Sequence, residues 1–379
     1  MEKAAIKLAN AHCVVIKIGS ALIVDQQRGN ARTAWLRSLV EDVVALRARG
    51  IKVVIVSSGA VALGRKYIPI QRSVMRLEEK QAAAACGQIE LVRYYRRMFA
   101  PHGIHAAQVL LTLRDSEDRR RYLNARNTLQ TLLNANIVPV INENDTVATT
   151  ELRFGDNDRL AARVAQMVGA DVLVLLSDID GLYSANPKLY PDAVHLPIVH
   201  EISPEIEAMA GNSISNMSSG GMVTKIEAAK IAMMSGCHMA ILKGKRRNPL
   251  QALLDERAKV TWFTPQESPA NARKTWIASM LQSKGELIVD DGALRALRIG
   301  KSLLPAGVVD IRGNFDRGDP VIIRDCRMKD IGRGLVAYAS DDAELIKGHH
   351  SREIENIVGF SGRDELVHRD DMVLWDMKE

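Results

Sequence analysis

Short apolar segments alternate with longer amphipathic segments over the first 255 residues of the chain. Between the first two apolar segments, hydrophobic residues recur at helical spacing from Trp35 to Val44, and Gly50 ends that run. Segments that are apolar on both faces are typical of parallel strands covered by helices on each side. The pattern therefore predicts an α/β fold, with an open, mostly parallel sheet sandwiched by helices. The predicted strands are Cys13–Ile18, Ile51–Val56, Ala106–Leu111, Ile137–Ile141, Val172–Leu176 and Met239–Leu242.

Small and polar residues follow several of these strands directly. They are Gly19-Ser20, Ser57-Ser58-Gly59, Asn142-Glu143-Asn144-Asp145 and Ser177-Asp178. In open α/β sheets, ligands bind outside the carboxyl ends of the strands. The sequence therefore predicts a binding site at this edge of the sheet.

The periodicity changes towards the C-terminus. It blurs from about Glu256 to Gly285, and a strand at Leu287–Val289, a helix around Gly292–Leu297 and short glycine-bounded segments follow. We expect a catalytic domain over residues 1–258, a linker over 259–283 and a small β-rich domain over 284–379.

Composition narrows the class of protein. The chain has 379 residues, of which 47% are hydrophobic and 25% charged, as in a globular protein of two domains. Its longest apolar stretches are too short to span a membrane, and its N-terminus lacks the layout of a secretory signal. The four cysteines form no CxxC pair, and the scattered histidines form no ligand set for a catalytic transition metal. These features predict free thiols in a cytoplasmic protein without a protein-held metal.

Charge is distributed unevenly along the chain. The net charge is +6, but residues 283–379 hold 15 Lys+Arg against 19 Asp+Glu, leaving 36 against 26 for residues 1–282. The positive excess in the front part suits an anionic small substrate as well as a polyanion, whereas the acidic balance of the back part argues against nucleic-acid binding there.

Lys17 lies inside an apolar strand, just before the Gly19-Ser20 turn. A buried lysine is rare unless it is paired, so this side chain is expected to point towards an anion at the strand end. An edge strand with a solvated lysine is the alternative.

A glycine-rich segment, Ser218-Ser219-Gly220-Gly221-Met222-Val223-Thr224-Lys225, opens a predicted helix. Glycines at a helix start let backbone N–H groups approach a phosphate, and Lys225 could reach the same anion. The spacing differs from a Walker A loop, and a flexible loop before an ordinary helix is the alternative. The chain also lacks a GxGxxG fingerprint after its first strand and a GxSxG elbow, which disfavours a dehydrogenase and an α/β-hydrolase.

Carboxylates and amides cluster in Asn142-Glu143-Asn144-Asp145 and Gly155-Asp156-Asn157-Asp158. Such clusters can hold a cationic amino group, orient lysines or hold hydrated Mg²⁺, and an acidic turn or helix cap is the plainer alternative.

In order and spacing, these motifs resemble the amino acid kinase family, and residues 284–379, with GELIVDDGA, SLLPAGV and HRDDM, resemble a PUA domain. The resemblance implies ATP-dependent phosphorylation of the γ-carboxylate of L-glutamate, the first step of proline biosynthesis, with Mg²⁺ bound mainly through the nucleotide. It also implies feedback inhibition by proline, a homo-oligomer and transfer of the product to a glutamyl-phosphate reductase. The alternatives are another kinase of the family, such as an acetylglutamate kinase, or an RNA-binding or RNA-modifying PUA protein.

The resemblance assigns roles to individual residues. Lys17, Lys225 and Asp158 correspond to catalytic residues, and Asp156 shares with Asp158 a role in orienting the lysines or holding the substrate. Further substrate-binding positions are Ser58, Gly59, Asp145 and Asn157. The ATP-binding positions are Lys17, Gly19, Ser20, Ser177, Asp178, Ser219, Gly220, Gly221, Met222, Val223, Thr224 and Lys225. The family usually has glycine where this chain has Ser218.

Overall fold

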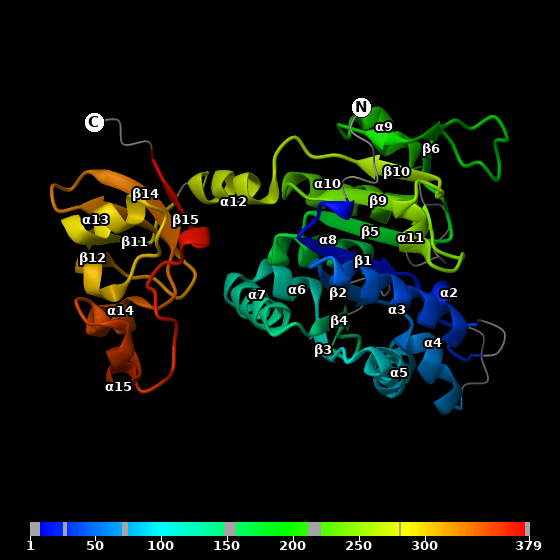
Figure 1. Cartoon of the computed structure of the whole chain (residues 1–379), viewed down its shortest axis with the longest axis horizontal. Helices are drawn as coiled ribbons and strands as arrows, with labels where there is room; N and C mark the ends of the chain where they lie inside the picture. The colour runs from blue at the N-terminus through cyan, green and yellow to red at the C-terminus, as the bar shows by residue number, and fades with distance from the viewer. Residues whose placement is uncertain are drawn as a thin grey trace. The chain divides into compact units, whose positions relative to one another are not determined.

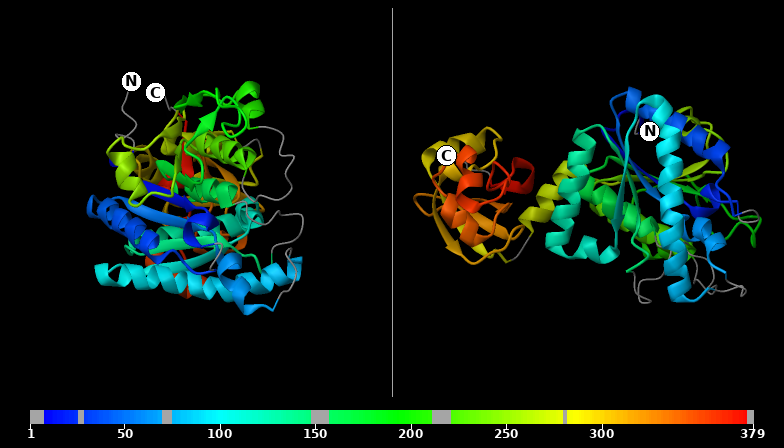
Figure 2. Two further views of the ribbon diagram at one scale, coloured as in Figure 1. Left: turned by 90° about the vertical axis from the view of Figure 1, so that its right-hand side faces the viewer. Right: turned by 90° about the horizontal axis from the view of Figure 1, so that it is seen from below.

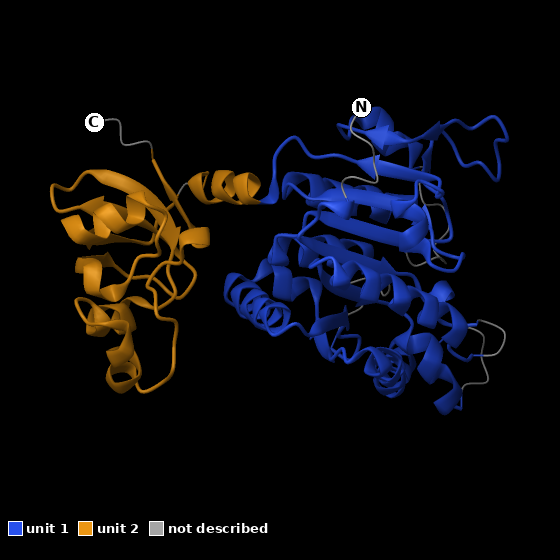
Figure 3. Cartoon of the chain, in the orientation of Figure 1, with its two compact units in different colours: residues 1–269 blue, residues 270–379 orange. Residues whose placement is uncertain are grey.

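The chain divides into two compact units, Met1–Pro269 and Ala270–Glu379 (Figure 3). A computed structural model describes residues 8–25, 29–69, 75–147, 157–210, 221–279 and 282–375. No described helix is long and apolar enough to cross a membrane.

Unit 1 is built on an eight-stranded sheet in the order β3-β4-β2-β1-β5-β9-β10-β8 (Figure 1). Neighbouring strands are parallel except β10, which is antiparallel to β9, so the predicted mostly parallel sheet is confirmed. The strands are β1 (Cys13–Ile18), β2 (Lys52–Ser57), β3 (Ala106–Leu111), β4 (Val138–Glu143), β5 (Val172–Ser177), β8 (Ile198–Val199), β9 (His238–Lys243) and β10 (Val260–Phe263).

Helices cover both faces of this sheet, and each face has its own apolar core. One core is packed against α2 (Ser20–Ile23), α3 (Thr33–Ala48), α4 (Ala60–Gly64), α5 (Leu77–Phe99) and α11 (Pro249–Leu254). The other is packed against α6 (Leu113–Glu117), α7 (Arg119–Asn134), α8 (Asn157–Val168), α9 (Pro204–Met209) and α10 (Met222–Met234). Smaller elements are the hairpin of β6 (Leu182–Tyr183) and β7 (His195–Leu196) and the 3₁₀ turns Arg65–Tyr67 and Ala100–His102. Figure 2 shows α5 as the long cyan helix along one side of the unit.

The alternation of side chains along β1 determines where Lys17 points. Val14, Ile16 and Ile18 belong to the α5 side, whereas Cys13 and Val15 belong to the α8 and α10 side. Because successive strand residues face opposite sides, Lys17 points towards α8 and α10. It is buried, with 7% of its surface exposed, so the edge-strand alternative is wrong.

Two glycines bring α4 unusually close to α5. A Cβ at Gly87 would lie 1.8 Å from the carbonyl oxygen of Ala60, and one at Gly64 would lie 1.8 Å from that of Ala83. These contacts leave no room for any side chain, so the two helices can pack at this distance only with glycine at both positions. α4 begins two residues after Ser58, which ties that part of the predicted site to α5.

Unit 2 contains a five-stranded sheet in the order β12-β11-β13-β14-β15, with one parallel pair, β11 and β13. Its own apolar core includes Leu287, Ile323 and Leu366. The strands are β11 (Gly285–Val289), β12 (Val308–Gly313), β13 (Pro320–Asp325), β14 (Asp330–Leu335) and β15 (Met372–Leu374). The helices are α12 (Pro269–Ala278), α13 (Asp291–Arg298), α14 (Ser340–Ile346) and α15 (Ile354–Val358), with 3₁₀ turns at Pro305–Gly307, Ser351–Glu353 and Arg369–Asp371.

The segment 259–283, for which the sequence predicts a linker, contains regular structure. β10 is a strand of the large sheet, and α12 begins where unit 1 ends. Arg273 of α12 forms an ion pair with the buried carboxylate of Asp371, which joins the helix to the rest of unit 2.

Candidate active site

Lys17, Asp158 and Lys225 form one buried ionic group, here called the lysine–aspartate cluster. Lys17 Nζ lies 2.5 Å from Asp158 Oδ1, and Lys225 Nζ lies 3.0 Å from Asp158 Oδ2. Lys17 comes from the end of β1, Asp158 from the first turn of α8 and Lys225 from the first turns of α10. The structure thus brings together three residues that are far apart in the sequence and that the sequence singles out as catalytic candidates.

The charges of this cluster favour the binding of an anion. Burial alone would raise the pKa of Asp158, but the charges and hydrogen bonds of Lys17 and Lys225 outweigh burial and lower it to about 2. The carboxylate therefore stays ionised at any physiological pH, and the three groups together carry one net positive charge. Two buried ammonium groups sharing one carboxylate can stabilise an incoming phosphate or carboxylate.

The first turn of α10 lies against the same carboxylate. Thr224 Oγ1 lies 3.1 Å from Asp158 Oδ2 and 2.9 Å from the carbonyl oxygen of Gly221, the residue that precedes the helix. Met222 and Val223 are the first two residues of this helix. The positive end of the α10 dipole is thus directed to the region of the two lysines.

The ends of β1 and β5 also meet at this edge. The backbone N–H of Gly19 donates to the carbonyl oxygen of Leu176 at 3.4 Å, and Ser20 begins α2. Ser177 Oγ donates to the carboxylate of the exposed Asp178 at 3.1 Å. Because the chain leaves β1 towards β2 while β5 lies on the opposite side of β1, this is a place where α/β sheets bind ligands.

A second polar group lies beside the first and is neutral. Asn157 Nδ2 donates to Ser58 Oγ at 2.6 Å and to Asn142 Oδ1 at 3.1 Å. Asn142 Nδ2 donates in turn to Gln88 Oε1 at 2.8 Å. We call Gln88, Asn142 and Asn157 the amide chain; all three are buried.

Gly59 and Asp145 complete the described part of this region. Gly59 has φ +109°, a conformation that favours glycine, and precedes the first turn of α4. Asp145 lies in the turn after β4, where burial raises the pKa of its carboxyl to about 6. A carboxyl whose ionised form is disfavoured in this way can be stabilised by a bound cation.

Three predicted site residues, Asp156, Ser219 and Gly220, lie outside the described residues, as does Ser218. Within the described ranges, no group of three or more His, Cys, Asp or Glu side chains is arranged to hold a metal ion.

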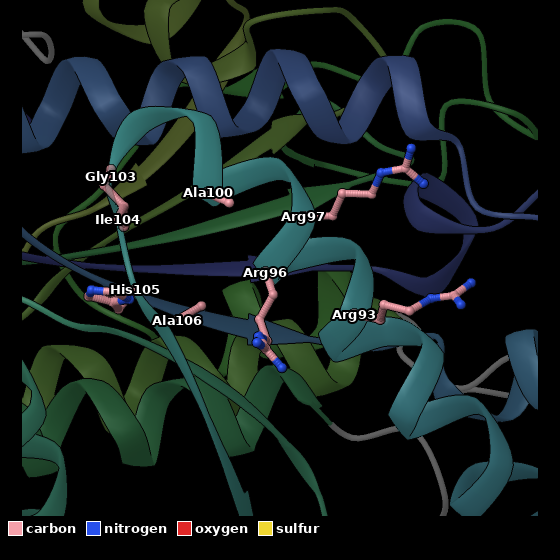
Figure 4. Close-up of a pocket in the computed structure, with 8 residues that line it drawn as sticks. All are labelled: Arg93, Arg96, Arg97, Ala100, Gly103, Ile104, His105 and Ala106. Carbon is pink, nitrogen blue, oxygen red and sulfur yellow. The ribbon is translucent and has the colours of Figure 1, made fainter.

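A pocket of about 500 Å³ lies elsewhere in unit 1. Arg93, Arg96 and Arg97 of α5 line it together with His105, which precedes β3 (Figure 4). It contains none of the predicted site residues, because it lies where β3 begins and they lie where the parallel strands end.

No motif in the sequence points to Gln88. It lies in the middle of a 23-residue helix, 54 residues before the side chain that it contacts. The available signal was a glutamine on the buried side of an otherwise apolar helix face, next to Gly87. Asn142 was noted as part of a motif without a role of its own.

Comparisons with known proteins give matches over most of the chain. Residues 12–243 match the model of the amino acid kinase family, and residues 285–358 match that of the PUA domain. A curated glutamate 5-kinase from Paramagnetospirillum magneticum is 56% identical over 97% of this chain and 99% of its own length. One from Bradyrhizobium diazoefficiens is 54% identical over 97% of this chain and 98% of its own length. The similarity therefore covers both units.

Proposed function

The chain belongs to the amino acid kinase family and, within it, to the glutamate 5-kinases; on that premise we propose that the lysine–aspartate cluster transfers the γ-phosphoryl group of ATP to the γ-carboxylate of L-glutamate. The observation that carries the proposal is the pair of buried lysines, Lys17 and Lys225, on either side of the Asp158 carboxylate.

The acceptor needs no general base. The γ-carboxylate of glutamate has a reference pKa of about 4.3, so it is already an anionic nucleophile at neutral pH. Asp158, with its pKa lowered to about 2, is too weak a base to take part in proton transfer. Its role in the proposal is to hold the two ammonium groups in place.

The main difficulty of the reaction is to bring two anions together. As a carboxylate oxygen forms its bond to the γ-phosphorus, the bond from that phosphorus to the β-phosphate oxygen breaks and ADP leaves with the electron pair. Lys17 and Lys225 would neutralise charge on the transferring group, and the backbone N–H groups at the start of α10 would bind phosphate oxygens. The product is γ-glutamyl phosphate, an acyl phosphate.

ATP and Mg²⁺ fit the described residues in different ways. The cationic cluster and the start of α10 suit the phosphates, with Gly19, Ser177 and Asp178 at the neighbouring strand ends. Mg²⁺ would be held mainly by nucleotide phosphates and water, as is usual for this ion at ATP sites. Bound in that way, the ion would add positive charge at the phosphates.

The neutral side of the site suits the amino acid end of glutamate. Asp145 and the Oδ1 atom of Asn157 are hydrogen-bond acceptors, and the α-ammonium group is the only strong donor that glutamate offers at neutral pH. Ser58 Oγ, which accepts from Asn157, can donate its own proton to a carboxylate of the substrate. A free ammonium group therefore fits better here than the amide of N-acetylglutamate.

Further proposals concern partners and location. We propose a cytoplasmic homo-oligomer that is inhibited by proline, whose amino and carboxyl groups resemble those of the substrate. The acyl phosphate is labile, which favours its transfer to a glutamyl-phosphate reductase.

The test is ADP formation with Mg-ATP and L-glutamate, with hydroxylamine present to trap the acyl phosphate as a hydroxamate. The wild-type protein should form hydroxamate, and Lys225→Ala should lose about 10²–10³-fold in kcat, as expected when a group that stabilises transition-state charge is removed. Turnover of N-acetylglutamate or a nucleoside monophosphate instead of glutamate would refute the proposed substrate.

Lys230→Ala is a matched control. Lys230 lies on the same helix, but it is partly exposed and pairs with Glu207. Its loss should leave kcat unchanged. An equal drop of kcat in both variants would show that any positive charge on α10 supports turnover, and would contradict a specific role of Lys225.

A further inference from the structure

Gln88 has no assigned role, yet it occupies one end of the amide chain. It belongs to α5, which packs on one face of the large sheet. Asn157 belongs to α8, which packs on the opposite face. Asn142 lies between them at the end of β4. The chain of hydrogen bonds therefore passes around the carboxyl edge of the sheet and joins the two helical layers.

The structure gives the three amides one consistent set of hydrogen bonds. Gln88 Oε1 accepts from Asn142 Nδ2, which leaves Asn142 Oδ1 to accept from Asn157 Nδ2. With its nitrogen engaged by Asn142 and Ser58, Asn157 turns its Oδ1 atom away from both. That oxygen is buried, and no described residue donates to it.

A purely structural explanation fits Gln88 poorly. Its Nε2 atom is buried and has no hydrogen-bond partner among the described residues, and the residue as a whole is only 8% exposed. A buried donor without a partner typically destabilises a fold by about 1–3 kcal/mol. The glutamine thus lowers stability through its nitrogen, while its oxygen holds Asn142.

We propose that Gln88 is a positioning residue for the acceptor substrate: through Asn142 it fixes the orientation of the Asn157 amide so that Asn157 Oδ1 accepts a hydrogen bond from the α-ammonium group of glutamate. This inference rests on the proposed function. If Asn142 loses its fixed acceptor, the Asn157 amide can turn and present its NH₂ group to the ammonium, which replaces attraction by repulsion between two donors.

The experiment compares Gln88→Met with wild type. Methionine keeps the length and removes the acceptor, so KM for glutamate should rise about tenfold, which corresponds to one hydrogen bond to a charged group. The KM for ATP and kcat should change less than about twofold, because the phosphoryl-transfer residues are untouched. Gln130→Met, at an exposed glutamine of α7, is the matched control and should change none of them.

Two further measurements separate positioning from loss of structure. In an Asn157→Ala background, Gln88→Met should add little to the KM for glutamate, since the group that it orients is gone. Glutarate, which lacks the ammonium group, should inhibit wild type and Gln88→Met with the same Ki. Additive effects in the double variant, or an equal loss of glutarate affinity, would overturn the inference.

A variant that fails to fold would not decide the question, so Gln88→Asn is the second variant. It keeps an amide but is one methylene shorter, so its oxygen does not reach Asn142, and the same rise in KM is expected. An unchanged KM in a folded variant, with wild-type turnover of glutamate intact, would refute the role of Gln88 alone. No glutamate turnover by wild type would refute the proposed function instead.

Discussion

The lysine–aspartate cluster and the amide chain lie at the same edge of one sheet and are built from opposite chemistry. Asn157 and Asp158 are consecutive residues, yet the first enters a neutral network and the second a group of three charges. The charged group can stabilise a charge that develops during the reaction, whereas the neutral group can orient a substrate that is already charged. We therefore expect changes in the cluster to act on kcat, and changes in the amide chain and its neighbours to act on KM for glutamate.

Asp158→Asn should have the largest effect. It removes the carboxylate charge that the two buried ammonium groups share, and breaking such a buried pair typically costs about 3–5 kcal/mol of stability. We expect kcat to fall about 10²-fold or more as the lysines move apart. Urea unfolding and steady-state kinetics on the same samples would measure both.

The acid dependence of stability provides the control for this change. The pKa of Asp158 is lowered from 3.8 to about 2, so its ionised form stabilises the fold above pH 3.8, and that contribution is lost as the pH falls towards 2. The difference in unfolding free energy between wild type and Asp158→Asn should therefore shrink over this range. A constant difference would contradict the role of the carboxylate charge.

Asp145 should give an intermediate effect, one that depends on pH. Since burial raises its pKa to about 6, protonation below that pH should weaken binding of the ammonium group and raise KM for glutamate, while kcat stays level. In Asp145→Asn this pH dependence should disappear, and KM should be about tenfold higher at pH 7.5. Rate profiles between pH 5 and pH 8 at saturating ATP would show it.

The same substitution should stabilise the protein without ligand. Because the pKa of Asp145 is raised from 3.8 to about 6, its ionised form is less favourable in the folded protein than in the unfolded chain. The free energy of unfolding therefore falls as the pH rises from 3.8 through 6. Asp145→Asn should accordingly raise Tm at pH 7.5 and leave it unchanged below pH 3.8. A lower Tm at pH 7.5 would show that Asp145 has a favourable partner in the protein.

Ser58→Ala should have the smallest effect of the series. It removes one hydroxyl donor to a substrate carboxylate and the acceptor of one Asn157 hydrogen bond, so KM for glutamate should rise about three- to tenfold with kcat nearly unchanged. A fall in kcat with constant KM, measured under the same conditions, would contradict the division of roles between the lysine–aspartate cluster and the amide chain with its neighbours.

The sequence predicted the framework of this site well. Cys13–Ile18 and Ala106–Leu111 were predicted with the bounds that the structure has, because apolar strands buried on both faces have a strong local pattern. The position of Lys17 in such a strand left a buried cation and a solvated lysine both open, and only the place of β1 inside the sheet decides for the buried one.

Contacts between distant segments could not be predicted in this way. The four residues Val260–Phe263 were read as part of a linker because so short a strand becomes recognisable only by its pairing with β9 and β8. The contact of Gln88 could not be predicted for the same reason, since nothing in the sequence of α5 indicates that Asn142 lies opposite. Periodicity reports which face of an element is buried, but not which polar side chain it meets there.

The close approach of Gly64 and Gly87 has a consequence for how this enzyme can change over evolution. A residue with a side chain at either position would push α4 and α5 apart, and with them the loop that carries Ser58 and the helix that carries Gln88. Any change of the site that needs these two helices to move apart is therefore blocked at its first step.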